Sequence, residues 1–178
     1  FYDAYLNKGV ALKNINKYEE ALKYFEFCIK VNRGDPKIYI NLGNLFLKQN
    51  NLKESLKAYD KAISLQDGFA EAYSNRGDIN QLLRNYKEAI ADFTKALKIN
   101  NDLDYVQGKI LYSKMYINEW NNFDLQISKL KKEISNKKKV ITPFPVLTLI
   151  DDPKIHMDIA EKYSQDNFPF LLNKQNIK

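Results

Sequence analysis

The sequence contains one cysteine, Cys28, and one histidine, His156, in 178 residues. A single cysteine excludes a disulfide within the chain and is typical of proteins from reducing compartments. One histidine with no second histidine or neighbouring cysteine does not form a Cys/His metal site, and it has no positioned partner for Ser–His or Cys–His catalysis. A glycine-rich phosphate loop and a CxxC motif are also missing. We therefore expect no catalytic residues, no metal and no cofactor in this chain.

Long apolar runs are absent as well. None approaches the roughly 18 residues of a membrane-spanning helix, and no secretory signal opens the chain. Five prolines and six glycines are too few for a disordered linker, whereas 44% hydrophobic residues suffice for a continuous core. We predict a folded cytoplasmic protein. Because the chain begins at Phe1 without a methionine, we expect it to be a piece of a longer one.

Charge of one sign is only slightly in excess. The net charge is +6, with 16 basic and 12 acidic groups in residues 1–100 and 12 and 10 in residues 101–178. Nucleic-acid binders usually gather basic residues into a stripe, so we do not expect a nucleic-acid partner. The densest basic run, residues 129–139, is interpreted as the solvated face and end of a helix rather than as an anion site.

Glycines, aromatic residues and small residues recur at a spacing of 34 residues. The series are Tyr5, Tyr39 and Tyr73; Gly9, Gly43 and Gly77; Ala21, Ser55 and Ala89; Phe25, Tyr59 and Phe93; and Cys28, Ala62 and Ala96. The last three series are separated by four and three residues, so their members share one helical face, where Cys28 is predicted to be buried as a small apolar residue. A fixed period of this length indicates a helical solenoid and resembles the tetratricopeptide (TPR) repeat.

The resemblance implies three helix–turn–helix repeats at residues 2–35, 36–69 and 70–103. We predict an all-α fold, a right-handed superhelical TPR solenoid with a divergent C-terminal helical extension. Between repeats, Gly34 is expected to cap the end of one helix, and Asp35 followed by Pro36 is expected to begin the next.

After residue 103 the small packing positions become large, and a divergent helical hairpin is predicted at residues 104–138 to close the solenoid. A proline-containing connector and a C-terminal helix are predicted at residues 139–178. Residues 142–145 are expected to be extended because proline disfavours helix in the residue before it, and residues 146–150 could form either strand or helix. Asp152 and Pro153 are expected to begin the last helix. The apolar segment 168–172 either folds back or meets a part of the protein beyond this sequence, so a homodimer is an open alternative.

The predicted binding surface is the inner face of the first helix of each repeat. Its residues follow from helical spacing around an asparagine that precedes each repeat glycine by two positions. They are Asn7, Val10, Asn14, Lys37, Asn41, Asn44, Lys48, Glu71, Asn75 and Asp78. Stacked hairpins would line these residues along a concave groove, which we predict to hold a protein or an extended peptide.

The asparagine series is Asn7, Asn41 and Asn75. An amide offers both donors and an acceptor, so a column of amides could pair with a peptide backbone without reading its side chains. The alternative is that asparagine at this position only serves helix packing. The set of Lys, Asn and Arg that some of these repeats use to clamp C-terminal carboxylates is incomplete here.

A second resemblance concerns the O-linked N-acetylglucosamine transferase family. The segment AEAYSNRGD at residues 70–78 is similar to its repeats, and Asn7, Asn41 and Asn75 match its asparagine ladder. Residues 118–124 (NEWNNFD) and 142–153 (TPFPVLTLIDDP) are similar to the connector before the catalytic domain of bacterial members. Three residues depart from that pattern: Glu119, where the family usually has Asp, and Phe144 and Pro145, where some members have a functional histidine. The resemblance implies, as an alternative to a self-contained scaffold, the non-catalytic recognition arm of such a glycosyltransferase.

Overall fold

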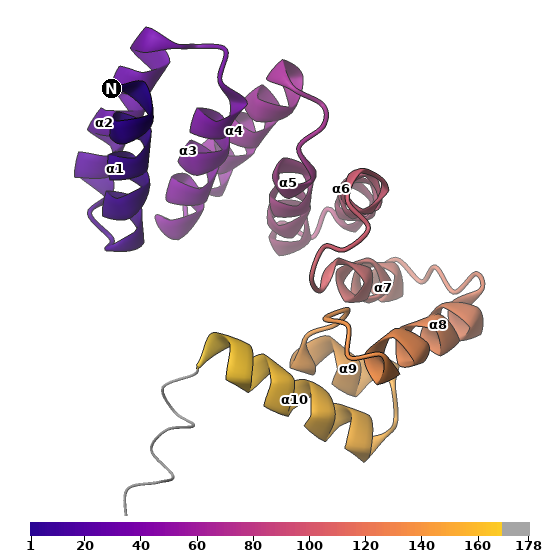
Figure 1. The fold of residues 1–178 in the computed structure, drawn as a ribbon. Coiled ribbons are helices and arrows are strands. Elements are labelled where there is room, and N and C mark those ends of the chain that lie inside the picture. Colours follow the sequence, from indigo (N-terminus) through magenta and orange to yellow (C-terminus); the bar gives the residue numbers. More distant parts are fainter. Residues whose placement is uncertain (169–178) are drawn as a thin grey trace, which may run out of the picture. The chain divides into compact units, whose positions relative to one another are not determined.

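The computed structural model describes residues 1–168 and confirms the predicted all-α class (Figure 1). Residues 169–172 of the apolar terminal segment lie outside the described part. The helices are α1 (Tyr2–Asn14), α2 (Tyr18–Val31), α3 (Pro36–Lys48), α4 (Leu52–Leu65), α5 (Ala70–Leu82), α6 (Tyr86–Ile99), α7 (Val106–Tyr116), α8 (Phe123–Ser135), α9 (Pro143–Leu149) and α10 (Pro153–Asn167). They form two compact units, Phe1–Asn101 and Asp102 onward, which are described separately.

In the first unit each repeat is a hairpin of two helices joined by a turn with one left-handed residue. That residue is Asn16, Asn50 or Arg84, with φ of 62°, 57° and 63°. The following amide nitrogen bonds back to the first helix, as in Asn51 N to Phe46 O at 2.8 Å. Asparagine tolerates the left-handed region better than most residues. Asn16 and Asn50 therefore suit their positions, whereas Arg84 is unfavourable at its position.

The predicted start of α3 at Asp35 and Pro36 is confirmed, whereas the predicted role of Gly34 as a helix cap was wrong. Asp35 caps α3, with its carboxylate accepting from the Lys37 amide at 2.9 Å and Pro36 at the first helical position. Gly34 is not a left-handed cap, because α2 already ends at Val31 with Asn32 as its cap residue, and the φ angle of Gly34 is not positive. The Asn32 side chain instead accepts from the Gly34 amide at 3.1 Å, so the turn depends on an asparagine and not on glycine.

Each repeat glycine contacts the aromatic ring of its own hairpin. A Cβ placed at Gly9, Gly43 or Gly77 would lie 2.6 Å from Phe25, 2.6 Å from Tyr59 and 2.7 Å from Phe93. All three rings are fully buried. The 34-residue period therefore reflects the packing of an aromatic ring against a glycine in each hairpin. In the first repeat, Ala21 is buried at the same interface, and Cys28 is buried as predicted.

A polar network joins the second and third repeats. Arg76 on α5 donates to both oxygens of the Asp92 carboxylate on α6, at 3.0 and 2.5 Å, and to Asp60 on α4 at 2.6 Å. Asn80 adds a bond to Asp92 at 3.0 Å. Asp92 is buried, so these bonds replace the water that its charge would otherwise need.

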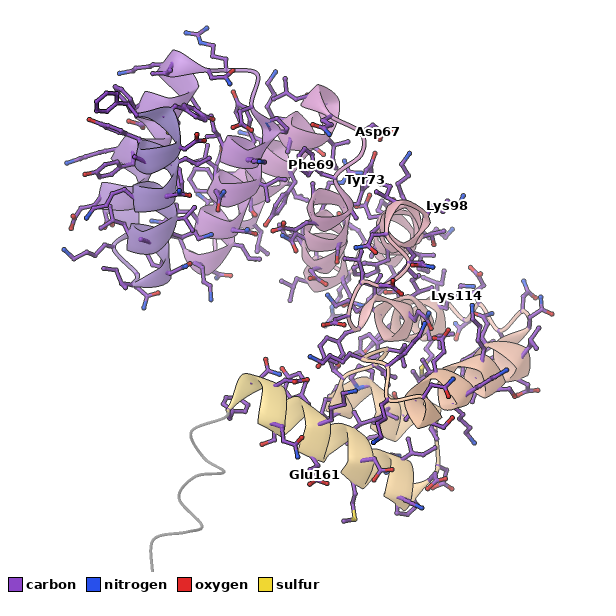
Figure 2. All side chains as sticks on the ribbon, in the orientation of Figure 1. Asp67, Phe69, Tyr73, Lys98, Lys114 and Glu161 are labelled. Carbon is purple, nitrogen blue, oxygen red and sulfur yellow. The ribbon has the colours of Figure 1, made fainter. Side chains whose placement is uncertain are left out.

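A second set of polar contacts joins Tyr73 to the loop between α4 and α5 (Figure 2). The Tyr73 hydroxyl donates to the Asp67 carboxylate, which also accepts from Lys95 Nζ at 2.9 Å. Burial raises the pKa of Tyr73 to about 12, and the bond to Asp67 acts in the same direction. The Tyr73 and Lys95 bonds hold the pKa of Asp67 below its usual range.

The second unit packs α7, α8, α9 and α10 around one core. Its buried residues are Leu111, Leu130, Val140, Ile141, Val146, Leu149, Ile150 and Ile159. Residues 139–141 bond to the start of α7, where Gly108 N donates to Val140 O at 2.8 Å. Residues from the predicted segment 104–138 and from the described part of the segment 139–178 thus contribute to a shared core.

The prediction of an extended segment at residues 142–145 was wrong, because a helix already begins at Pro143. Thr142 is extended and precedes it, as the restriction before proline requires. Pro143 and Pro145 both fall in the first turn, where amide nitrogens have no partner within the helix, so neither proline removes a hydrogen bond. Asp152 caps α10 as predicted, accepting from the amides of Lys154 and Ile155 at 3.0 and 3.3 Å.

Candidate functional site

Two hollows lie on the face that the first helices of the repeats share. The first has a volume of about 340 Å³ and is lined by Leu6, Asn7, Val10, Lys37, Ile40, Asn41, Phe69 and Glu71. The second, of about 350 Å³, is lined by Lys13, Asn14, Asn16, Asn44, Leu47 and Lys48. Both combine residues of α1 and α3, and the first also includes residues at the start of α5. We call them the apolar hollow and the basic hollow.

Eight of the ten predicted groove residues line one hollow or the other. The two that do not are Asn75 and Asp78, both half-buried on α5. Spacing along single helices also missed several lining residues. Leu6, Ile40 and Phe69 form the floor of the apolar hollow. Lys13 lies six residues after Asn7, outside the rows counted at intervals of three and four, and its position depends on the neighbouring α3.

The three asparagines differ in their surroundings. Asn41 donates to the Lys37 carbonyl at 3.0 Å and accepts from Lys13 Nζ at 3.1 Å. Asn75 donates to the Asn44 side chain at 3.0 Å. Asn7 is exposed and forms no side-chain hydrogen bond within residues 1–168. Asn41 and Asn75 thus connect helices within the fold, and a uniform ladder of three open amides stays a prediction.

Asn44 accepts a second bond, from the hydroxyl of the buried Tyr59 at 2.5 Å. This bond anchors the groove asparagine to the ring that covers Gly43. Burial raises the pKa of Tyr59, so its hydroxyl keeps the proton that Asn44 accepts. The Asn44 side chain therefore connects a position that lines one of the two hollows with the glycine–aromatic core.

The two hollows differ in charge and polarity. The basic hollow has Lys13 and Lys48 beside three asparagines and includes no acidic residue among its lining residues. Burial lowers the pKa of the Lys13 ammonium, an effect opposed by Glu71 and supported by Lys48. The apolar hollow has four apolar side chains with Lys37, Glu71 and two asparagines at its edge. The basic hollow suits a carboxylate, and the apolar hollow suits an apolar side chain.

Other kinds of site find less support. Residues 1–168 contain no group of three or more His, Cys, Asp or Glu side chains placed to hold a metal ion. Within the same residues, no helix combines the length and the apolar character that crossing a membrane requires. Cys28 is buried, and burial raises the pKa of its thiol, which disfavours the reactive thiolate.

Comparison with known proteins identifies the repeats. The sequence model of the tetratricopeptide repeat matches residues 2–35, 36–69 and 70–103. A comparison with curated protein sequences finds no match. Among solved structures, the Arabidopsis OM64 TPR domain is similar, with a TM-score of 0.61 and 23% identity over 65% of this chain and 95% of that domain.

A further similar structure is the first TPR of Spaghetti (RPAP3) bound to the HSP90 peptide SRMEEVD. Its TM-score is 0.62, with 17% identity over 66% of this chain and 93% of the other. At these identities the two structures establish the shared helical fold. The three matched repeats cover more than half of the sequence and decide its family. The chain belongs to the tetratricopeptide repeat family.

Proposed function

We propose that the chain is a protein-binding scaffold whose groove holds an extended peptide segment of a partner protein. The observation that carries the proposal is the pair of hollows on one face, one apolar and one basic. An apolar side chain of the peptide would enter the hollow floored by Leu6, Ile40 and Phe69. A carboxylate, from an acidic side chain or a C-terminus, would pair with Lys13 and Lys48.

The exposed amide of Asn7 supports this proposal, because it is open to pair with a peptide backbone. The peptide bound by the similar RPAP3 repeat is acidic and ends in EEVD, which agrees with the charge of the basic hollow. Lys37 and Asn41 line the apolar hollow on α3 and would contact the peptide backbone beside the apolar anchor. The chain itself would perform no chemistry.

The experiment is selection from a display library of random octapeptides with free C-termini. Selected peptides are expected to contain an apolar residue together with Asp or Glu, or to bind more weakly once their C-terminal carboxylate is amidated. Their affinities are then measured by fluorescence anisotropy for the variants Asn7→Ala, Lys37→Ala and Lys48→Ala. These side chains form no hydrogen bond or ion pair within residues 1–168, so their loss does not disturb the fold. A loss of affinity on replacing Asn41 or Asn75 would be harder to interpret, since both side chains form hydrogen bonds between helices.

We expect each groove variant to bind about three- to tenfold more weakly, because each removes one hydrogen bond or one charge contact. The matched control is Lys61→Ala, an exposed lysine on α4, which should bind as the wild type does. Equal affinity of Lys48→Ala and Lys61→Ala would contradict the assignment of the basic hollow. Selected peptides that lack Asp and Glu and keep their affinity after amidation of the C-terminus would contradict it as well.

An alternative function is that the chain is the recognition arm of a glycosyltransferase. It rests on the similarity of residues 118–124 and 142–153 to a connector. In the structure Trp120 is half-exposed and contacts Phe123 edge to face at a centroid distance of 5.0 Å, so the similar segment forms a turn with an open aromatic surface. The full-length reading frame tests this alternative. A nucleotide-sugar-binding domain after Lys178 would support it, and a stop codon there would rule it out.

A further inference from the structure

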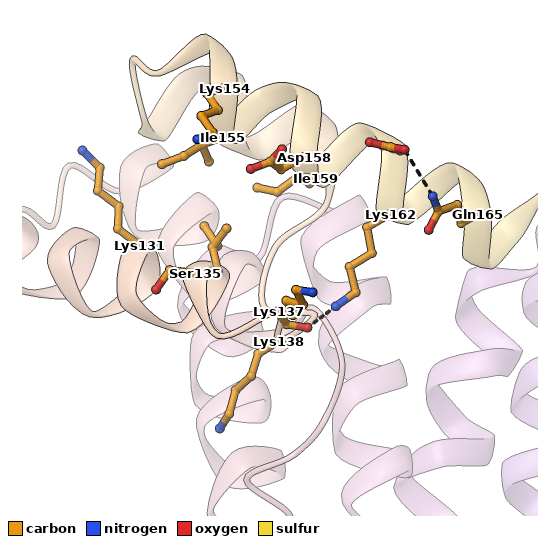
Figure 3. A pocket seen from close by; sticks show the side chains of 12 residues that line it. Lys131, Ser135, Lys137, Lys138, Lys154, Ile155, Asp158, Ile159, Lys162 and Gln165 are labelled. Atoms are coloured by element: carbon orange, nitrogen blue, oxygen red, sulfur yellow. Dashed lines mark hydrogen bonds between the residues drawn. The ribbon is translucent and has the colours of Figure 1, made fainter.

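A third hollow, of about 650 Å³, lies in the second unit between α8 and α10 (Figure 3). Five of its lining residues are lysines. Lys131 comes from α8, Lys137 and Lys138 from the turn that follows, and Lys154 and Lys162 from α10. Part of the basic run at residues 129–139, which the sequence suggests is only a solvated helix end, therefore meets two further lysines from another helix.

None of these five ammonium groups forms an ion pair with a carboxylate among residues 1–168. The Lys162 ammonium donates to the Lys137 carbonyl instead. Asp158 and Glu161 line the same hollow and offset part of the charge. Five lysines against two carboxylates still make the hollow cationic, so the arrangement suits an anionic ligand.

Lys154 is the most informative of the five. It follows Pro153 in the first turn of α10, near the positive end of the helix dipole, where a cation is unfavourable. Lys137 and Lys138, by contrast, follow the C-terminal end of α8, where the dipole favours a cation. Helix electrostatics therefore explain part of the lysine cluster and leave Lys154 unexplained. Such a departure from local preference is typical of functional positions.

Isoleucines form the apolar part of this hollow. Ile134 of α8 and Ile155 of α10 are half-buried, and Ile159 is buried below them. The hollow is thus a recess between two helices with apolar side chains inside and ammonium groups at the edge. A recess of this kind fits the apolar stripe of a helix better than a flat bilayer surface.

We propose that this recess binds an acidic amphipathic helix of a partner protein. Apolar residues on one face of that helix would contact the isoleucines, and flanking carboxylates would pair with Lys131, Lys138 and Lys154. The remaining residues of this chain do not match the charge, because 169–178 contain two lysines and no aspartate or glutamate. The site is separate from the repeat groove and independent of the function proposed for it.

The test uses a fluorescein-labelled synthetic peptide of about 16 residues, with leucines three and four positions apart and glutamates between them. Binding to the full chain is measured by fluorescence anisotropy at two salt concentrations. The triple variant Lys131→Gln, Lys138→Gln and Lys154→Gln is compared with a matched control, Lys23→Gln, Lys53→Gln and Lys61→Gln. The control removes the same charge from exposed positions of the repeats.

We expect the triple variant to bind the peptide about tenfold more weakly than the wild type, because three surface charge pairs are lost. The control should match the wild type within a factor of two. A peptide with serines in place of the leucines should bind weakly to all three proteins. Amide chemical shifts of the ¹⁵N-labelled chain should change in α8 and α10.

Two results would overturn the proposal directly. One is an equal loss of peptide affinity in the control variant, and the other is amide chemical-shift changes confined to α1, α3 and α5. Binding to phosphatidylserine vesicles without binding to the peptide would assign the lysines to a membrane surface instead. Tighter peptide binding after deletion of residues 169–178 would assign the recess to the chain's own terminal segment.

Discussion

Replacing Gly43 by alanine tests whether ring-on-glycine packing is what the 34-residue period encodes. A Cβ at this position would lie 2.6, 2.7 and 2.9 Å from Cε1, Cζ and Cδ1 of Tyr59. Carbon atoms in favourable contact are about 3.5–4.0 Å apart, so the ring would have to move by about 1 Å. It has no room to do so, because it is fully buried and its hydroxyl donates to Asn44.

The expected free-energy change combines two opposing terms. Inserting a methyl group into a filled core costs about 1–3 kcal/mol, and alanine is favoured over glycine within a helix by about 1 kcal/mol. Because the methyl group meets three ring atoms at once, we place the first term near its upper limit. Gly43→Ala should therefore lower the free energy of unfolding by roughly 1–2 kcal/mol, measured by urea denaturation with circular dichroism at 222 nm.

The matched control is Gly34→Ala. A Cβ there would meet only the Asn32 side chain, at 3.5 Å, and the backbone is not left-handed. Its stability should stay within about 0.5 kcal/mol of the wild type. In a Tyr59→Leu background, Gly43→Ala should cost much less, since the ring is gone. A Gly43→Ala protein as stable as the wild type would refute the packing explanation.

Three further predictions follow from the repeats. Arg84→Asn should raise the free energy of unfolding by up to about 1 kcal/mol in urea denaturation, because asparagine tolerates φ of 63° better; an unchanged midpoint would contradict this. Asp92→Ala should lower it by about 2–3 kcal/mol by leaving Arg76 without its buried partner, whereas Asp60→Ala, at the exposed partner, should change it by less than about 1 kcal/mol. Burial raises the pKa of Tyr73 to about 12, so folding keeps the proton and stability falls as the pH rises from 10 to 12; Tyr73→Phe should show a smaller fall in urea midpoint over that range, and an equal fall would refute the assignment.

The helices and their turns could be predicted to a large extent from the sequence. The pairing of Gly9 with Phe25 recurs at two further positions, and spacings of three and four residues give each helix its buried face. These are local properties, because the geometry of a helix relates residues within a few turns of one another. The exceptions were also local. Gly34 offered a glycine cap where Asn32 forms the turn, and Pro145 suggested an extended chain although the first turn of a helix accommodates it.

The peptide-binding groove stays a prediction, and the same reasoning anticipated only part of the lining of the two hollows. Asn7, Val10 and Lys48 line the two hollows, as their positions on single helices suggested. Two hydrogen bonds, Lys13 to Asn41 and Asn75 to Asn44, join different helices. The bonded residues are 28 and 31 positions apart in the sequence. Spacing along one helix contains no information on such bonds, so it did not separate the open amide from the engaged ones.

The sequence by itself determined the helical repeats, their period and the buried glycine–aromatic packing within each hairpin. These follow from short-range spacing, in which the same side chains recur at the same helical positions. Only the tertiary structure decided which polar groups are left open on the shared face of the first helices and brought Lys154 and Lys162 beside the basic run at the end of α8. The physical reason is that the approach of two helices depends on the packing of their whole interface, to which residues far apart in the chain contribute.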